Sequence, residues 1–220
     1  MKRICLLLML LALCACFFQG CTGKASAIEN GDLVFVGFRA DSSAAQGSMD
    51  EAIVSATGSG EVNMVHVAIV EVEGDSLWII DATRRRGVSR YPLDEFIKDN
   101  TGRRGSSVLV VRRMKDNSLA AEWIERAKTF LGQPYDSLFL PDNGAMYCSE
   151  LVRESFLSAR GEYLLEDKPM NFKGPDGEYP LYWKNLFEGL GMDVPQGVPG
   201  TNPHDMSNSP KLYSPGITLP

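Results

Sequence analysis

The stretch NMVHVAIVEVEGDSLWIIDAT, Asn63 to Thr83, predicts an antiparallel β-hairpin. Its two apolar runs, Val65–Val72 and Leu77–Ala82, are rich in β-branched residues, which favour strands. The polar segment EGDS separates the runs by a length that is typical of a hairpin turn. Each run also contains one residue that does not match its apolar character, His66 in the first and Asp81 in the second. The hairpin therefore predicts both a local fold and two polar groups inside it.

Further strands are predicted on either side of the hairpin. Leu33–Phe38 is an apolar run that follows a turn, and Gly87–Tyr91 and Val108–Arg112 come after the hairpin. Short helices are expected at Met49–Ser55, inside a loop rich in Ser, Ala and Gly, and at Leu93–Lys98. Because consecutive strands usually pair with one another, we expect an antiparallel sheet.

Two amphipathic helices are expected after the strands. DNSLAAEWIERAKTFLG spaces apolar residues along one face and meets a stop signal at Gly132. YCSELVRESFLSARG begins a second helix at or next to Cys148, with its stop at Gly161. The inward face of this second helix is predicted to hold Leu151, Val152, Ser155, Phe156 and Ala159.

The remainder of the chain, from about residue 168 to residue 220, is rich in Pro, Gly and Asn. We expect one short helix there, Trp183–Leu190, within an ordered wrap or a partly loose segment. Strands followed by helices predict an α+β fold, an antiparallel sheet packed against helices, in one domain that spans about residues 28–220.

The N-terminus is expected to be an export signal. Lys2 and Arg3 precede the apolar stretch Ile4–Phe18, which is too short for a convincing membrane-spanning helix. A lipoprotein-type signal, residues 1–20, would leave Cys21 as the lipidated residue, and cleavage after Ala27 is the alternative. We therefore expect an exported protein of the cell envelope, anchored to the membrane through Cys21 and facing the periplasm.

The charge of the chain excludes some partners. The net charge is −6, and it becomes −8 without residues 1–20, which hold two positive charges and no acids. An acidic exported domain is a poor nucleic-acid binder. We expect no nucleic-acid partner, and membrane contact only through the N-terminal lipid anchor.

The cysteines raise a question about Cys148. The other four, at positions 5, 14, 16 and 21, lie in the signal or at its cleavage site. Cys148 then has no cysteine to pair with inside the domain. It is either the first core residue of its helix or a reactive thiol at a helix N-terminus, where the free N–H groups and the positive partial charge stabilise a thiolate.

A reactive thiol needs a base and a group that orients the base. His66 is a polar residue in an apolar strand and needs a partner, which Asp81 in the return strand can supply if the two are neighbours. The acidic residues that flank the hairpin turn, Glu71 and Glu73, are expected to be solvated, and His204 in the tail is expected on the surface.

A zinc site made of Cys148, His66 and Asp81 is the competing interpretation. No close pair of Cys or His ligands supports it, and the sequence contains no Gly-rich phosphate loop. We therefore expect no metal and no cofactor.

The segment GQPYDSLFLPDNGAMYCSELV resembles the cysteine segment of the NlpC-type cell-wall hydrolases, which are papain-like. In most of those enzymes the cysteine precedes the histidine, whereas His66 here precedes Cys148. The order NGDLVFV, HVAIV, YCSELV is similar to the circularly permuted branch, the YiiX/YebB-like bacterial hydrolases, to which lecithin:retinol acyltransferase is distantly related. The resemblance covers about residues 29–160 and implies a circularly permuted papain-like fold.

The resemblance also implies roles for particular residues. Cys148 becomes the nucleophile, His66 the base and Asp81 the third member of the triad. Tyr135 is suggested as a hydroxyl near the oxyanion or substrate, with an ordinary packed aromatic as the alternative. Tyr147 stands where the cell-wall peptidases often have an acid, and Glu150 where glycine is common, so specificity for a murein stem peptide does not carry over. Both are retained as candidate substrate-contacting residues.

The function expected from the sequence is that of an exported cysteine peptidase or amidase, which cleaves an amide in a small peptide, such as one derived from the cell wall. An esterase or acyltransferase that acts on lipid or acyl substrates would use the same machinery. A non-catalytic module that binds a peptide or amino acid is the third alternative. The complete Cys, His and Asp set argues against that module, because a pure binder has no need of all three.

Overall fold

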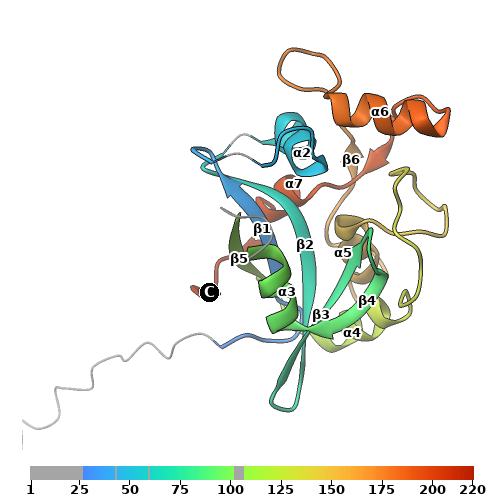
Figure 1. The fold of residues 1–220 in the computed structure, drawn as a ribbon. Helices are drawn as coiled ribbons and strands as arrows, with labels where there is room; N and C mark the ends of the chain where they lie inside the picture. The colour runs from blue at the N-terminus through green and yellow to red at the C-terminus, as the bar shows by residue number, and fades with distance from the viewer. Residues whose placement is uncertain (1–26, 43, 59, 102–106) are drawn as a thin grey trace, which may run out of the picture.

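Six antiparallel strands form the central sheet in the computed structural model, which describes residues 27–42, 44–58, 60–101 and 107–220 (Figure 1). The antiparallel sheet predicted from the sequence is confirmed. Each predicted strand lies within an observed one, and the observed strands extend beyond it by up to three residues at an end. The order across the sheet is β4 (Gly87–Pro92), β3 (Ser76–Thr83), β2 (Val62–Glu73), β1 (Leu33–Arg39), β5 (Ser107–Met114) and β8 (Leu212–Tyr213).

The hairpin of β2 and β3 pairs over only part of its length. The ladder runs from Glu73 opposite Ser76 to Ile69 opposite Ile80. Gly74 in the turn has φ +59°, a conformation that glycine adopts without steric cost. His66 and Asp81 both lie beyond the last ladder pair, on the side where the two strands separate.

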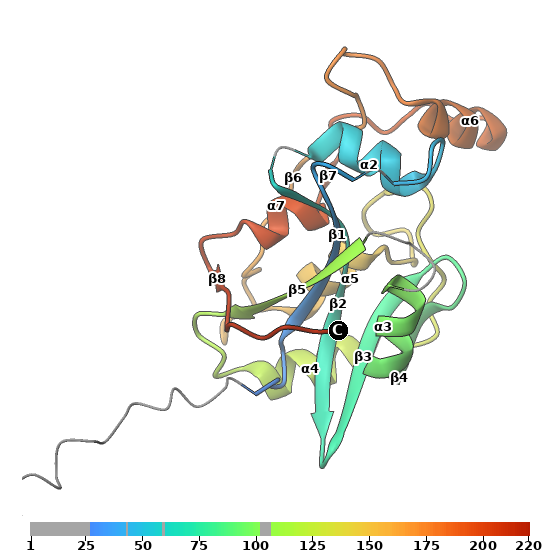
Figure 2. The same ribbon diagram turned by 60° about the vertical axis from the view of Figure 1, so that its left-hand side comes forward.

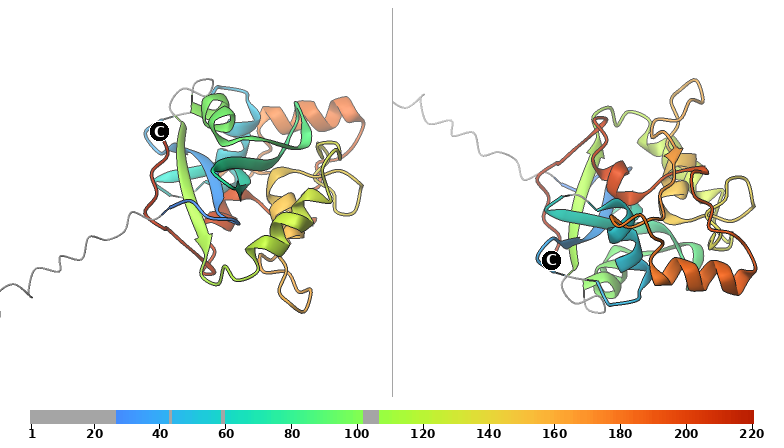
Figure 3. Two further views of the ribbon diagram at one scale, coloured as in Figure 1. Left: turned by 90° about the horizontal axis from the view of Figure 1, so that it is seen from below. Right: turned by 90° about the horizontal axis from the view of Figure 1, so that it is seen from above.

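Helices cover both faces of the sheet, and the covering elements are α4 (Ala120–Lys128), α5 (Cys148–Ser155) and α3 (Leu93–Thr101). Figure 3 shows α3 and α4 on opposite sides of the strands. Alternate residues of β1 enter the two cores: Leu33 and Phe35 pack with α4 and α5, and Val34 and Val36 pack with α3. A strand that is buried on both faces has a continuous apolar sequence, as β1 does.

The tail beyond residue 168 is an ordered wrap. It contains β6 (Lys168–Pro169), α6 (Leu181–Leu190), β7 (Pro199–Gly200) and α7 (Pro203–Ser207), and β8 closes it by pairing with β5. Figures 1 and 2 show α6 beside α2 (Met49–Thr57), beyond one end of the sheet. Aromatic rings join these parts, for example Phe172 and Trp183, whose centroids lie 5.2 Å apart.

Helix α5 is shorter than predicted. It ends at Ser155, because Phe156 leaves the helical conformation with ψ 84°, and Gly161 lies in a later turn with φ +80°. The N–H of Ser158 donates to the carbonyl of Glu162, which closes that turn. The predicted inward face is correct as far as Phe156, whereas Ala159 is exposed.

Two predicted surface residues are buried. Glu71 is 4% exposed and pairs with Arg90 and Lys128, which lower the pKa of its carboxyl despite the opposing effect of burial. His204 is also 4% exposed, and its Nδ1 accepts a hydrogen bond from the N–H of Met64 at 3.4 Å. Both predictions were wrong because each residue is covered by an element distant in sequence. Glu73 is exposed as expected.

The predicted signal, residues 1–20, and the predicted lipidation site at Cys21 lie outside the described residues. Within the part of the chain that the structure describes, no helix has the length and hydrophobicity needed to cross a membrane.

Candidate active site

His66 lies beside a β-bulge in β2. Val36 of β1 is opposite His66, but the next residue, Gly37, is opposite Met64, so Val65 is the extra residue. The backbones approach closely here, since a Cβ added to Gly37 would lie 2.9 Å from the carbonyl oxygen of Asn63. A bulge changes the direction of the side chains next to it, and glycine permits this one.

Asp81 holds the imidazole of His66. The Nε2 atom of His66 lies 3.0 Å from Oδ2 and 2.9 Å from Oδ1 of Asp81, which is fully buried. The structure therefore brings together the two hairpin residues that the sequence suggested as partners. They face each other across the gap between the separated strands and are not a ladder pair.

Tyr91 is a site residue that the sequence analysis missed. Its hydroxyl donates to Oδ2 of Asp81 at 2.7 Å, and the side chain is 7% exposed. Tyr91 lies on β4 opposite Ile79, two residues before Asp81 on β3. Its position at the end of an amphipathic strand gave no local signal, because the contact depends on the register between β3 and β4.

Cys148 is the first residue of α5 and is 6% exposed. Its thiol and the His66 imidazole line the same pocket. Because Nε2 of His66 is directed at Asp81, Nδ1 is the ring nitrogen left for Cys148. The first N–H groups of a helix have no partner within the helix, so the start of α5 offers hydrogen-bond donors beside the sulfur.

The electrostatics of the pair favour a charged imidazole. The pKa of His66 is raised to about 10. Burial is the largest single effect and lowers the pKa, but the negative charges of Asp81 and Cys148, with hydrogen bonds to both, outweigh it. The ring of Phe96 stacks on the imidazole, with centroids 6.1 Å apart. The arrangement can therefore hold a thiolate beside an imidazolium.

Tyr135 is fixed next to the nucleophile by a short backbone pairing. It forms a bridge with Met146, in which the N–H of Asp136 donates to the carbonyl of Met146 at 3.1 Å. The side chain of Tyr135 lines the pocket with Cys148. Burial, followed by the charge of Cys148, raises the pKa of its phenol well above the ordinary value. Tyr135 therefore remains a hydroxyl that can donate a hydrogen bond.

The other two candidate substrate residues have different positions. Tyr147 lines the pocket, and its hydroxyl oxygen accepts from the N–H of Thr201 at 2.9 Å, which attaches the tail to the start of α5. Glu150 is not among the pocket-lining residues. Its Oε2 accepts from the N–H of Tyr147 at 3.3 Å, so it caps α5. Burial, aided by the negative charges of Asp136 and Glu154, raises the pKa of Glu150 to about 8.

The tail supplies one wall of the pocket, which the sequence analysis did not foresee. The pocket has a volume of about 50 Å³, and the sheet, α5, α2 and the tail all contribute to it. The aromatic residues scattered through the tail were the available signal, but their partners could not be deduced from spacing. Tail residues in this wall include Met170, Phe172, Trp183 and Thr201.

The geometry gives no support to the competing zinc site. Within residues 27–42, 44–58, 60–101 and 107–220, no group of three or more His, Cys, Asp or Glu side chains is placed so that it could hold a metal ion. Cys148 is a free, buried thiol.

Comparison with known proteins identifies the family to which the chain belongs. The chain is 26% identical over 189 residues to "Uncharacterized protein YiiX" of Escherichia coli K12, with 84% of each chain covered. The fold is similar to that of the crystal structure of "metalloprotein yiiX" from Escherichia coli O157:H7, with a TM-score of 0.65 at 24% identity, covering 84% of this chain and 95% of that one. Residues 27–214 match the model of the family described as "Permuted papain-like amidase enzyme, YaeF/YiiX, C92 family". The chain therefore belongs to the permuted papain-like amidases, a family of cysteine hydrolases, as the order of its motifs indicated.

Proposed function

We propose that this cysteine hydrolase cleaves an amide bond in a peptide, with Cys148 as nucleophile, His66 as base and Asp81 as the residue that orients His66. One observation carries the proposal. Asp81 binds one nitrogen of His66 while the other nitrogen is left for a thiol at a helix N-terminus. A nucleophile, a base and an orienting acid in this relation are the requirement for covalent acyl transfer.

In the first half of the reaction the thiolate of Cys148 attacks the carbonyl carbon, and a C–S bond forms. The negative charge on the oxygen is stabilised by the N–H of Cys148 and by the hydroxyl of Tyr135. The intermediate then collapses, the C–N bond breaks, and the imidazolium of His66 gives its proton to the departing amine. A thioester of Cys148 and a free amine result.

In the second half a water molecule attacks the thioester while His66 accepts its proton. The C–S bond breaks, a carboxylic acid is released, and the thiolate–imidazolium pair is restored. Asp81 keeps the ring in the correct orientation and stabilises its positive charge in both halves. The hydroxyl of Tyr91, bound to the same carboxylate, fixes Asp81 in turn.

The chemistry can be tested on a panel of murein-derived peptides and acyl esters, with the wild type and Cys148→Ala. We expect turnover of peptides that the substitution abolishes. Turnover that survives it would contradict the mechanism, and Cys148-dependent turnover confined to esters would replace the peptide with an acyl substrate. The apolar residues of the pocket, including Ile53 and Phe172, are the observation that favours the ester alternative.

A second, independent test measures the thiol itself. Cys148 is the one cysteine after residue 21, so a mass shift after treatment with iodoacetamide reports on it alone in the mature protein. We expect alkylation of the native protein at neutral pH. Modification only after unfolding would mean that Cys148 is an ordinary core residue.

We also propose that the protein is exported and anchored through a lipid on Cys21. The family match begins at residue 27, which supports a leader separate from the hydrolase domain. Mass spectrometry of the mature N-terminus, in the wild type and Cys21→Ser, tests this. We expect a lipidated Cys21 that the substitution removes, whereas an unmodified terminus at Ile28 would indicate cleavage after Ala27.

A further inference from the structure

A second pocket lies next to the one at Cys148. It has a volume of about 280 Å³, more than five times that of the Cys148 pocket, and is lined by residues between 164 and 211. This volume is just below the range for small-molecule sites, about 300–1,000 Å³. None of the residues with a role in the proposed reaction lines this pocket, so the reaction itself does not explain why the pocket is there.

The two pockets share part of their walls. Met170, Thr201 and Asn202 line both of them. The N–H of Thr201 is bound to the hydroxyl of Tyr147, the residue directly before Cys148. The shared wall is therefore attached to the start of the nucleophile's helix, and the larger pocket lies directly beside the one that holds Cys148.

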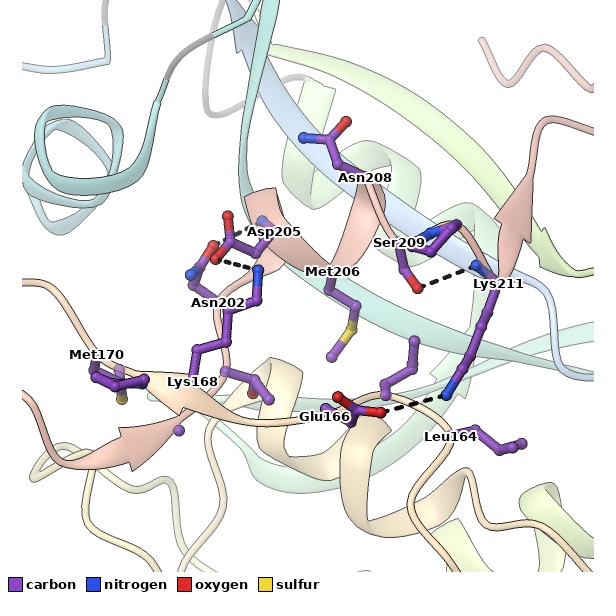
Figure 4. A pocket seen from close by; sticks show the side chains of 15 residues that line it. Leu164, Glu166, Lys168, Met170, Asn202, Asp205, Met206, Asn208, Ser209 and Lys211 are labelled. Carbon is purple, nitrogen blue, oxygen red and sulfur yellow. Dashed lines mark hydrogen bonds and ion pairs between the residues drawn. The ribbon is translucent and has the colours of Figure 1, made fainter.

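The larger pocket has a mixed polar and apolar surface. Figure 4 shows Lys168 and Asp205 on one side and Lys211 and Glu166 on another, with Met206 between them. The Nζ atom of Lys168 lies 3.4 Å from Asp205, and that of Lys211 lies 3.8 Å from Glu166, so charges of both signs are present. Side chains of Asn202, Asn208 and Ser209 add further polar atoms, and none of the lining residues is aromatic.

We infer that this pocket, which we name the distal subsite, binds the peptide segment of the substrate that lies beyond the cleaved amide. A peptide carries amide donors and acceptors and charged groups of both signs, which the rim can match. A fatty acyl chain can form no hydrogen bond with the polar side chains of Asn202, Asn208 and Ser209, whereas a peptide can. The inference rests on the proposed amide hydrolysis at Cys148 and specifies its substrate class.

The test compares two series of substrates that share the same cleaved amide. One series is extended by alanine residues in either direction, and the other by methylene groups. In the wild type we expect kcat/KM to rise at least about tenfold with peptide length and not with acyl length. A gain confined to the acyl series would overturn the inference.

Two variants test whether the dependence of kcat/KM on peptide length arises in the distal subsite. Lys168→Trp and Lys211→Trp place a bulky ring in the distal subsite from two sides, and both lysines are exposed enough for the fold to tolerate the change. We expect each variant to reduce the ratio of kcat/KM for the longest and shortest peptides at least about tenfold. Lys184→Trp on α6 is the matched control, since Lys184 is similarly exposed and lines neither pocket, and it should keep the wild-type ratio. If both Lys168→Trp and Lys211→Trp kept the wild-type ratio of kcat/KM for the longest and shortest peptides, the peptide would not bind in the distal subsite.

A measurement of peptide binding tests the distal subsite independently of the proposed reaction at Cys148. Calorimetry with the longest alanine peptide and the Cys148→Ala protein needs no turnover. We expect binding that Lys168→Trp weakens at least about tenfold in the same background. If binding follows this pattern but no wild-type turnover is found, the distal subsite stands and the amidase proposal fails. Binding that is insensitive to Lys168→Trp would refute the distal subsite whatever the enzyme activity.

Discussion

The hairpin of β2 and β3 and the C-terminal tail both build the active-site pocket, but they do so by different means. The hairpin contributes His66 and Asp81, whose side chains touch each other directly. The tail contributes a wall, which an aromatic cluster and a bond from Thr201 to Tyr147 hold in place. The hairpin therefore provides the proposed base and its orienting acid for Cys148 on α5, and the tail shapes the space around them.

The largest effect is expected at the nucleophile. Cys148→Ala should lower kcat at least about 10³-fold, because the residues that act as a unit lose most of their effect when one of them is removed. Steady-state kinetics would measure the loss, and circular dichroism would check that the fold is retained. Residual activity close to that of the wild type would mean that the hairpin and α5 do not perform the chemistry.

Substitution of the orienting acid should have the next largest effect. Asp81→Asn should lower kcat by about 10²- to 10⁴-fold, since the amide cannot stabilise the imidazolium as a carboxylate does. Tyr91→Phe, which removes only the hydrogen bond to Asp81, should cost much less. If Asp81→Asn lowered activity no more than Tyr91→Phe did, the orienting role of the carboxylate would be wrong.

The titration of His66 provides a direct test of the charged pair. The chain has two histidines, His66 and His204, so their ring protons can be assigned by NMR with single substitutions. We expect the pKa of His66 at about 10 and that of His204 below its ordinary value, since burial lowers the latter. In Cys148→Ala the pKa of His66 should fall, because the negative charge of Cys148 no longer raises it. A pKa of His66 that is equal in both proteins would contradict the thiolate–imidazolium pair.

The His66 shift also predicts how stability depends on pH. The pKa of His66 in the folded state, about 10, lies above the ordinary value of 6.5. The stabilisation that this group contributes is therefore complete below pH 6.5 and is lost as the pH rises from 6.5 through 10. Urea denaturation across this range should show the loss in the wild type and a smaller loss in Cys148→Ala.

In the tail, a single hydrogen bond should affect stability more than catalysis. Tyr147→Phe leaves the buried N–H of Thr201 without its acceptor and should lower the free energy of unfolding by about 1–3 kcal/mol. Tyr163→Phe is the control, because Tyr163 is 41% exposed and should change the free energy of unfolding by less than about 0.5 kcal/mol. If Tyr147→Phe reduced kcat as strongly as Asp81→Asn did, the proposal that the hairpin contributes to the chemistry and the tail only to the shape of the pocket would be wrong.

The smallest effect on catalysis is expected at Glu150, whose substitution should change mainly how stability depends on pH. Its folded-state pKa of about 8 lies above the ordinary value of 4.5, so its contribution to stability is complete below pH 4.5 and is lost as the pH rises through 8. Glu150→Gln, which cannot ionise, should gain stability relative to the wild type between these two pH values. Urea denaturation at both ends of this pH range measures the difference in the free energy of unfolding between Glu150→Gln and the wild type. A difference that does not change with pH would contradict the raised pKa of the Glu150 carboxyl.

The fold followed largely from local patterns. Alternating and continuous apolar runs predicted five strands of the sheet and the helices α2 to α6, because those patterns depend on neighbours within a few residues. The end of α5 was wrong, since Phe156 leaves the helix five residues before the glycine that marked its expected stop. The two-residue strands of the tail were not predicted, because so short a segment has no periodicity of its own.

The sequence by itself determined the residue types of the site. A lone cysteine at a helix start, a histidine and an aspartate in apolar strands, and the order of their motifs were sufficient to indicate a permuted papain-like hydrolase. Only the tertiary structure decided which residues surround them. The contact of Tyr91 with Asp81, the burial of Glu71 and His204, and the tail wall with the larger pocket beside it all join segments distant in sequence. Such contacts depend on strand register and on how the chain returns to the sheet, which local sequence patterns do not encode.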